Sequence, residues 1–150
     1  MLNRPRLVWL FAGVLLGLAT GCGSPSSQAT QPDVTQAQVR VPVPGSKMTA
    51  GYFTIHNRGL TPLTLTGASS PEALSISLHT TQRTEGTIRM RPLGDLTLAP
   101  DEIVRFSPGG RHMMISLMQE TPLTAGSDVV INLHFADRED LRVPFRISAL

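Results

Sequence analysis

Closely spaced turn signals divide most of this chain into short apolar runs, and this spacing restricts the folds that are open to it. The runs have the length and composition of strands, and none shows a convincing 3.6-residue apolar period. Residues 129–135 alternate clearly, with apolar side chains at every odd position. Turn signals such as Pro44-Gly45 and Pro108-Gly109-Gly110 separate the runs. The sequence therefore predicts one all-β domain, an antiparallel sandwich or barrel. The predicted strands are 38–43, 51–57, 63–67, 74–81, 87–91, 102–107, 112–118, 128–135 and 141–147.

The first 21 residues have the pattern of a bacterial export signal. Arg4 and Arg6 precede a thirteen-residue apolar run over 7–19, shorter than the roughly 20 residues that a membrane-spanning helix needs. Residues 18–22 (LATGC) are similar to a lipobox, in which the cysteine becomes the lipidated first residue of the mature chain. The alternative is an ordinary signal peptide followed by an unrelated cysteine. We predict a lipoprotein-type signal peptide over 1–21, lipidation at Cys22, the only cysteine, and an extracytoplasmic, membrane-anchored location.

The segment after Cys22 is rich in Ser, Gln, Thr, Pro and Gly and poor in apolar residues. We predict that 22–38 is a flexible tether between the lipid and a domain over 39–150. Removal of the signal peptide takes away two of the 13 basic residues and none of the 11 acidic ones, so the remaining chain has no net charge. No binding of nucleic acid is therefore expected, and the predicted membrane contact is the lipid anchor alone.

The run that follows Pro108-Gly109-Gly110 carries a pair of candidate metal ligands. Side chains alternate along a strand, so His112 and Met114 lie on one face, while Met113, Ile115 and Leu117 face a core. The turn and the run together predict the second strand of a hairpin. A neutral imidazole and a soft thioether suit Cu(I) better than zinc or a hard cation.

Two further candidate ligands lie upstream, on either side of a predicted turn at 83–86. His79 ends an alternating run on its serine face, and Met90 follows the turn. If the turn is centred between Thr84 and Glu85, His79 and Met90 are direct cross-strand neighbours, roughly 5 Å apart at Cβ. The alternative for Met90 is plain core packing, since it shares a face with Ile88.

These four residues have the spacing H-x10-M-x21-H-x-M. This spacing resembles the signature of the PCuAC family of periplasmic copper chaperones. Other segments also look like that family, namely 51–57 (GYFTIHN), 67–71 (GASSP), 90–93 (MRPL) and 108–114 (PGGRHMM). The likeness runs from about residue 40 to residue 147, nearly the whole predicted mature chain.

The resemblance implies a cupredoxin-like Greek-key β-sandwich for 39–150, with one Cu(I) bound by His79, Met90, His112 and Met114. It also implies a chaperone rather than an enzyme. The copper would go to a respiratory oxidase, with the CuA centre of cytochrome c oxidase subunit II as acceptor and a Sco-like protein as a partner.

Other classes of copper, zinc and catalytic protein need residues that can be looked for in the same sequence. A blue-copper electron carrier needs a cysteine ligand, and Cys22 lies at the predicted lipidation point. A copper oxidase or zinc enzyme would need three or more His or a carboxylate near an open position. Ser-His-Asp catalysis has no supporting elbow motif. Two alternatives stay open: a metal-free β-sandwich lipoprotein of the envelope, and a protein that sequesters copper without transferring it.

The remaining His and Met residues are expected to lie outside the site. His56 and His134 match family positions that are not ligands, and alternation predicts that His134 is exposed. Met118 is about 13 Å along the strand from Met114, at 3.3 Å per residue, and is expected to be packing. Met48 is expected in a loop, and nothing in the sequence supports a copper contact from it.

Overall fold

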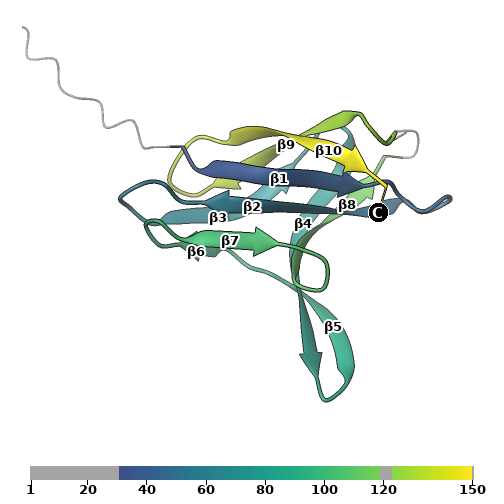
Figure 1. Ribbon diagram of the computed structural model, residues 1–150, viewed down its shortest axis with the longest axis horizontal. Helices are drawn as coiled ribbons and strands as arrows, with labels where there is room; N and C mark the ends of the chain where they lie inside the picture. The colour runs from purple at the N-terminus through teal and green to yellow at the C-terminus, as the bar shows by residue number, and fades with distance from the viewer. Residues whose placement is uncertain (1–30, 119–122, 150) are drawn as a thin grey trace, which may run out of the picture.

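The computed structural model describes residues 31–118 and 123–149, and every element in these ranges is a strand (Figure 1). Nine of the ten strands correspond to strands predicted from the sequence. The exception is β6, whose three residues are too few to show an alternating pattern. The predicted all-β class is confirmed. The strands are β1 (Asp33–Arg40), β2 (Met48–His56), β3 (Leu63–Ser69), β4 (Ala73–Thr84), β5 (Thr87–Pro92), β6 (Leu96–Leu98), β7 (Ile103–Phe106), β8 (Arg111–Leu117), β9 (Asp128–Phe135) and β10 (Leu141–Ser148).

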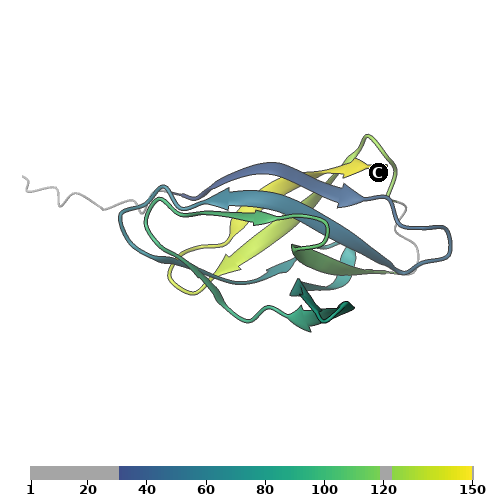
Figure 2. The ribbon, with the colours of Figure 1, turned by 60° about the horizontal axis from the view of Figure 1, so that its bottom comes forward.

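Seven strands close into a barrel in the order β4-β8-β2-β1-β10-β9-β3, and β3 pairs with β4 through Ala68 and Ile76. Neighbours in this ring are antiparallel except β1 and β10, which are parallel. The chain passes from β2 to β3 and from β8 to β9 without those strands pairing, as Greek-key connections do. Figure 2 shows the yellow-green strands β9 and β10 behind the blue strands β1 and β2. The predicted antiparallel Greek-key fold is confirmed.

Aromatic and branched side chains from strands on both sides of the barrel fill its interior. The Phe53 ring stacks on Phe106 at a centroid distance of 4.3 Å and meets Phe145 edge-on at 5.7 Å. Contacts of this kind contribute roughly 0.5–1.5 kcal/mol each beyond the burial of apolar area. The predicted alternation over 129–135 is confirmed, because each odd-numbered residue is buried. The same holds for Met113, Ile115 and Leu117 in β8.

The first strand begins earlier than the sequence predicts. Asp33 pairs with His56 and Val34 with Ile55, so the predicted tether over 22–38 is wrong for residues 33–38. The reason is a bulge: Gln36 has a φ of +54°, and the register shifts between Thr35 and Gln38. The shift hides the period of two that would reveal a strand. The signal peptide, Cys22 and the tether up to residue 30 lie outside the described residues, and no helix in the described ranges is long and apolar enough to span a membrane.

The predicted hairpin into β8 is also wrong. Instead, β7 and β8 both pair with β2, β7 against Phe53–His56 and β8 against Met48–Gly51. They run in the same direction along β2, like one strand interrupted by residues 107–110. The glycine turn is present, with Gly109 at a φ of +76°, and it loops out of the strand rather than reversing it. This loop contributes the Gly110 carbonyl to the site described below.

Asn57 is the polar residue that holds the loops at the β6 end of the barrel. It is fully buried, and its Nδ2 donates to the carbonyls of Thr61, Leu98 and Ala99 at 2.8–3.2 Å. Its Oδ1 accepts from the Gly59 N–H at 3.1 Å. One side chain therefore satisfies the backbone of two loops.

We expect Asn57→Ala to lower the free energy of unfolding by about 3 kcal/mol, because buried backbone groups lose their partners. Denaturant unfolding measures this loss. The control is Thr97→Ala, which removes an exposed hydroxyl contact to Thr64 and should change the free energy by less than about 0.5 kcal/mol. A loss below about 1 kcal/mol for Asn57→Ala would show that solvent or neighbouring groups replace its hydrogen bonds.

Candidate metal centre

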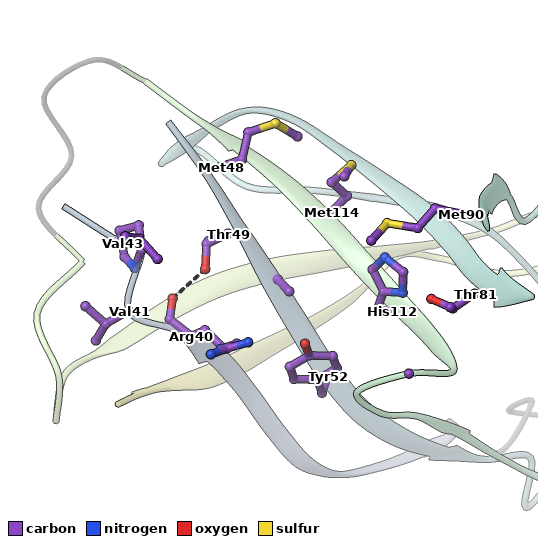
Figure 3. Close-up of a pocket in the computed structure, with 13 residues that line it drawn as sticks. Arg40, Val41, Val43, Met48, Thr49, Tyr52, Thr81, Met90, His112 and Met114 are labelled. Carbon is purple, nitrogen blue, oxygen red and sulfur yellow. Dashed lines mark hydrogen bonds between the residues drawn. The ribbon is translucent and has the colours of Figure 1, made fainter. Parts of the chain in front are cut away.

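A cavity of about 340 Å³ lies on the outward face of the sheet, over β2, β8 and the β4–β5 hairpin. Four of its lining side chains carry soft or imidazole donors: Met48, Met90, His112 and Met114 (Figure 3). The rest of the lining is Arg40, Val41, Pro42, Val43, Thr49, Ala50, Tyr52, Thr81 and Gly109. It contains no carboxylate and a single charged residue, Arg40.

Alternation along β8 places His112 and Met114 on the cavity side. The residues between and beyond them, Met113 and Ile115, are buried in the core. Met113 lies across β2, where its Cε is 2.7 Å from the position that a Cβ at Gly51 would take. A side chain at Gly51 would therefore displace the end of Met113, the residue between the two candidate ligands.

The His112 ring is held by the loop between β7 and β8. It is 7% exposed, and its Nδ1 lies 3.1 Å from the Gly110 carbonyl oxygen. A carbonyl only accepts hydrogen bonds, so Nδ1 carries the proton and Nε2 keeps its lone pair. The same carbonyl accepts from the Thr81 N–H at 3.1 Å. Such a backbone partner sets the tautomer and orientation of a metal-binding imidazole.

His79 is the direct cross-strand partner of His112. The two rings meet edge to face with centroids 5.9 Å apart. His79 does not line the cavity. Its Nδ1 is buried and has no hydrogen-bond partner in the described structure, a state that costs roughly 1–3 kcal/mol. This orphaned nitrogen fits a metal ligand, which would give it a partner.

Met90 reaches the cavity from the hairpin of β4 and β5, which Figure 1 shows projecting from the barrel. The predicted pairing of Met90 with His79 is wrong: Met90 pairs with Thr81, and His79 pairs with Pro92. The turn is centred between Glu85 and Gly86, which both have positive φ, +48° and +79°, as in a type I′ turn.

The shift of the turn by one residue moves the pairing by two, so Met90 keeps the face of His79. Figure 3 shows the Met90 side chain pointing from β5 toward His112. Met90 is 59% exposed, which excludes the alternative that it is core packing.

The other His and Met residues differ in part from expectation. His56 bonds Asp101 at 2.6 Å and is remote from the cavity lining. Met118, which follows the last residue of β8, is 45% exposed rather than packed. Met48 is not in a loop but is the first residue of β2, and it lines the cavity.

His134 faces outward as alternation predicts and is half-buried, and both of its ring nitrogens have partners. Nδ1 lies 2.8 Å from Asp140 Oδ2, and Nε2 lies 2.9 Å from Ser69 Oγ. This order matches a Ser-His-Asp triad, and the sequence showed no motif for it. Ser69 lies at the end of an extended strand and not on a sharp turn that would present its hydroxyl to a substrate. The three residues link β3, β9 and the loop before β10.

The gathered donors favour a soft ion. Within residues 31–118 and 123–149, no three His, Cys, Asp or Glu side chains come together as a possible metal site. The cavity instead brings together Met90, His112 and Met114, and His79 lies edge to face against the His112 ring. Neutral thioethers and imidazoles of this kind suit Cu(I).

Comparison with known proteins finds relatives in sequence and in fold. The family model described as "Putative lipoprotein LpqE-like" matches residues 33–147. The protein named "Putative lipoprotein Lxx21020" of Leifsonia xyli subsp. xyli is 32% identical over 135 residues, which cover 84% of this chain and 79% of that protein.

Among solved structures, the copper-bound PCuAC domain from PmoF2 has a TM-score of 0.66 at 19% identity, over 81% of this chain and 96% of that domain. The solution structure of CuI-DR1885 from Deinococcus radiodurans has a TM-score of 0.59 at 28% identity, over 87% of this chain and 85% of that one. The predicted likeness to PCuAC domains is thus confirmed, and the match over residues 33–147 shows that the chain belongs to the LpqE-like lipoprotein family.

Proposed function

We propose that this protein is an extracytoplasmic copper chaperone that binds one Cu(I) through His79, Met90, His112 and Met114. The observation that carries the proposal is the cavity in which Met90, His112 and Met114 meet, with His79 against His112. The fold likeness to a copper-bound PCuAC domain and to CuI-DR1885 supports the choice of ion. Binding and release need no chemical step, so the proposed role is not enzymatic.

The ligand types suit a carrier outside the cytoplasm. Free thiols tend to oxidise to disulfides there, whereas a thioether cannot form one. Methionine therefore keeps a soft ligand available in an oxidising compartment. The site also opens to solvent, since Met90 is 59% exposed and belongs to a projecting hairpin. An accessible site with neutral ligands favours release of the ion to a partner.

The acceptor in this proposal is a respiratory oxidase, at the CuA centre of cytochrome c oxidase subunit II, with a Sco-like protein as a partner. This part rests on the resemblance to the PCuAC family alone. The anchor in the proposal is a lipid on Cys22 after cleavage of residues 1–21. The lipoprotein names of the family and of the Leifsonia protein support it.

We expect wild-type protein to bind one Cu(I) per chain, and Met90→Leu and Met114→Leu each to lower its affinity by about 100-fold or more, since each removes a direct ligand and loss of an outer-shell partner alone costs roughly 10–100-fold. Leucine keeps the apolar volume, so the circular dichroism spectrum should not change. Competition with a chromophoric Cu(I) chelator under anaerobic, reducing conditions measures the affinity. Ile103→Val, at an exposed position outside the cavity lining, is the control and should bind as wild type does.

Equal Cu(I) binding by wild type and both variants would remove the proposed site. No binding by wild type would favour a metal-free envelope lipoprotein. Tight binding without transfer to purified CuA-domain acceptor would favour sequestration.

We expect Cys22→Ser to abolish lipidation and release the protein from the membrane. Expression in a bacterial host with labelled palmitate should label wild type and not the variant, and the variant should move from the membrane to the soluble extract. The control is Ser24→Ala, which leaves the lipobox intact and should stay labelled. Labelling of Cys22→Ser, or none in wild type, would contradict the anchor.

A further inference from the structure

Met48 is an accessible methionine that the core does not use. It is 45% exposed at the start of β2. Its backbone is fixed, because its N–H donates to Ser46 Oγ at 3.1 Å and its carbonyl accepts from the same hydroxyl at 2.9 Å. The neighbouring Lys47 carbonyl accepts from the Leu117 N–H at 2.8 Å. The strand therefore sets where the side chain starts, and the thioether remains open to the cavity.

The pairing of β2 with β8 places Met48 beside Met114. Met48 pairs with Ser116 and Ala50 with Met114, so Met48 and Met114 share a face as diagonal neighbours. Such positions are roughly 7–8 Å apart, within reach of long side chains. Both residues line the same cavity, and Figure 3 shows Met114 between Met48 and Met90.

The order of the strands places these donors in a row across the sheet. His79 on β4 flanks β8 on one side, and Met48 on β2 flanks it on the other. Met114, one of the four proposed ligands, therefore lies between Met48 and the other three. The wall near Met48 is apolar, with Val41 and Val43, so the thioethers are the soft donors on this side of the cavity.

We propose that Met48 is a relay ligand, which holds Cu(I) together with Met114 while the ion passes between solvent or a partner and the four-residue site. This inference rests on the proposed function. During loading, the bond from copper to the Met48 sulfur breaks as bonds to His112, Met90 and His79 form, and release is the reverse. Copper stays Cu(I), and no electron or proton moves, because every donor is neutral.

The test compares Met48→Leu with Met118→Leu, a matched control that is also 45% exposed but does not line the cavity. Stopped-flow absorbance follows Cu(I) loading from its bathocuproine disulfonate complex and release to an excess of that chelator. A step on the path slows both directions equally, so we expect Met48→Leu to lower both rates about tenfold. The equilibrium affinity should stay within about twofold of wild type, and Met118→Leu should change neither quantity.

Unchanged rates in Met48→Leu would overturn the relay. A lower affinity with an unchanged loading rate would make Met48 a resident ligand and would also overturn it. In the same assay, Met90→Leu reports on the four-residue site. Full affinity in that variant would reject the proposed function and the relay together, whereas loss of affinity there with unaltered Met48→Leu kinetics would reject the relay alone.

Discussion

The pairing of β4 with β8 is the constraint on which the candidate site depends. Leu78 lies opposite Met113 in the core, and both side chains are almost fully buried. The next pair along, His79 and His112, must then lie on the outward face. A slip of one residue would turn the imidazoles toward the core and Met113 toward the outer face, so the hydrophobic core fixes the register. The apolar interior thus specifies the positions of the two candidate imidazole ligands.

Backbone groups then orient the candidate ligands that the register brings together. The loop of 107–110 interrupts what would be one strand, and its Gly110 carbonyl fixes the His112 tautomer. The turn at Glu85 and Gly86 aims β5 so that Met90 faces the same cavity. The loop and the turn are both local features, and both depend on a glycine. They leave a set of neutral donors on an open face, which suits an ion that must be held and then given up.

The sequence predicted most of this fold because its strands alternate visibly, as residues 129–135 do. It failed where the backbone departs from regular geometry. The bulge at Gln36 concealed the start of β1, and the looped-out turn before β8 looked like a hairpin. For the site, a spacing of two residues sufficed to place His112 and Met114 on one face. The position of Met48 in the cavity lining could not be predicted. It depends on which strand lies beside β8, and such a long-range pairing leaves no local pattern.

In the proposed site, residues from β4, β5 and β8 converge on one soft ion. Crystals of the Cu(I)-loaded protein, with diffraction measured on both sides of the copper absorption edge, locate that ion directly. We expect one anomalous peak, within bonding distance of the Met90 and Met114 sulfurs and of the His79 and His112 rings. A peak beside His56 and Asp101 or beside His134 and Asp140, or no peak in loaded crystals, would contradict it.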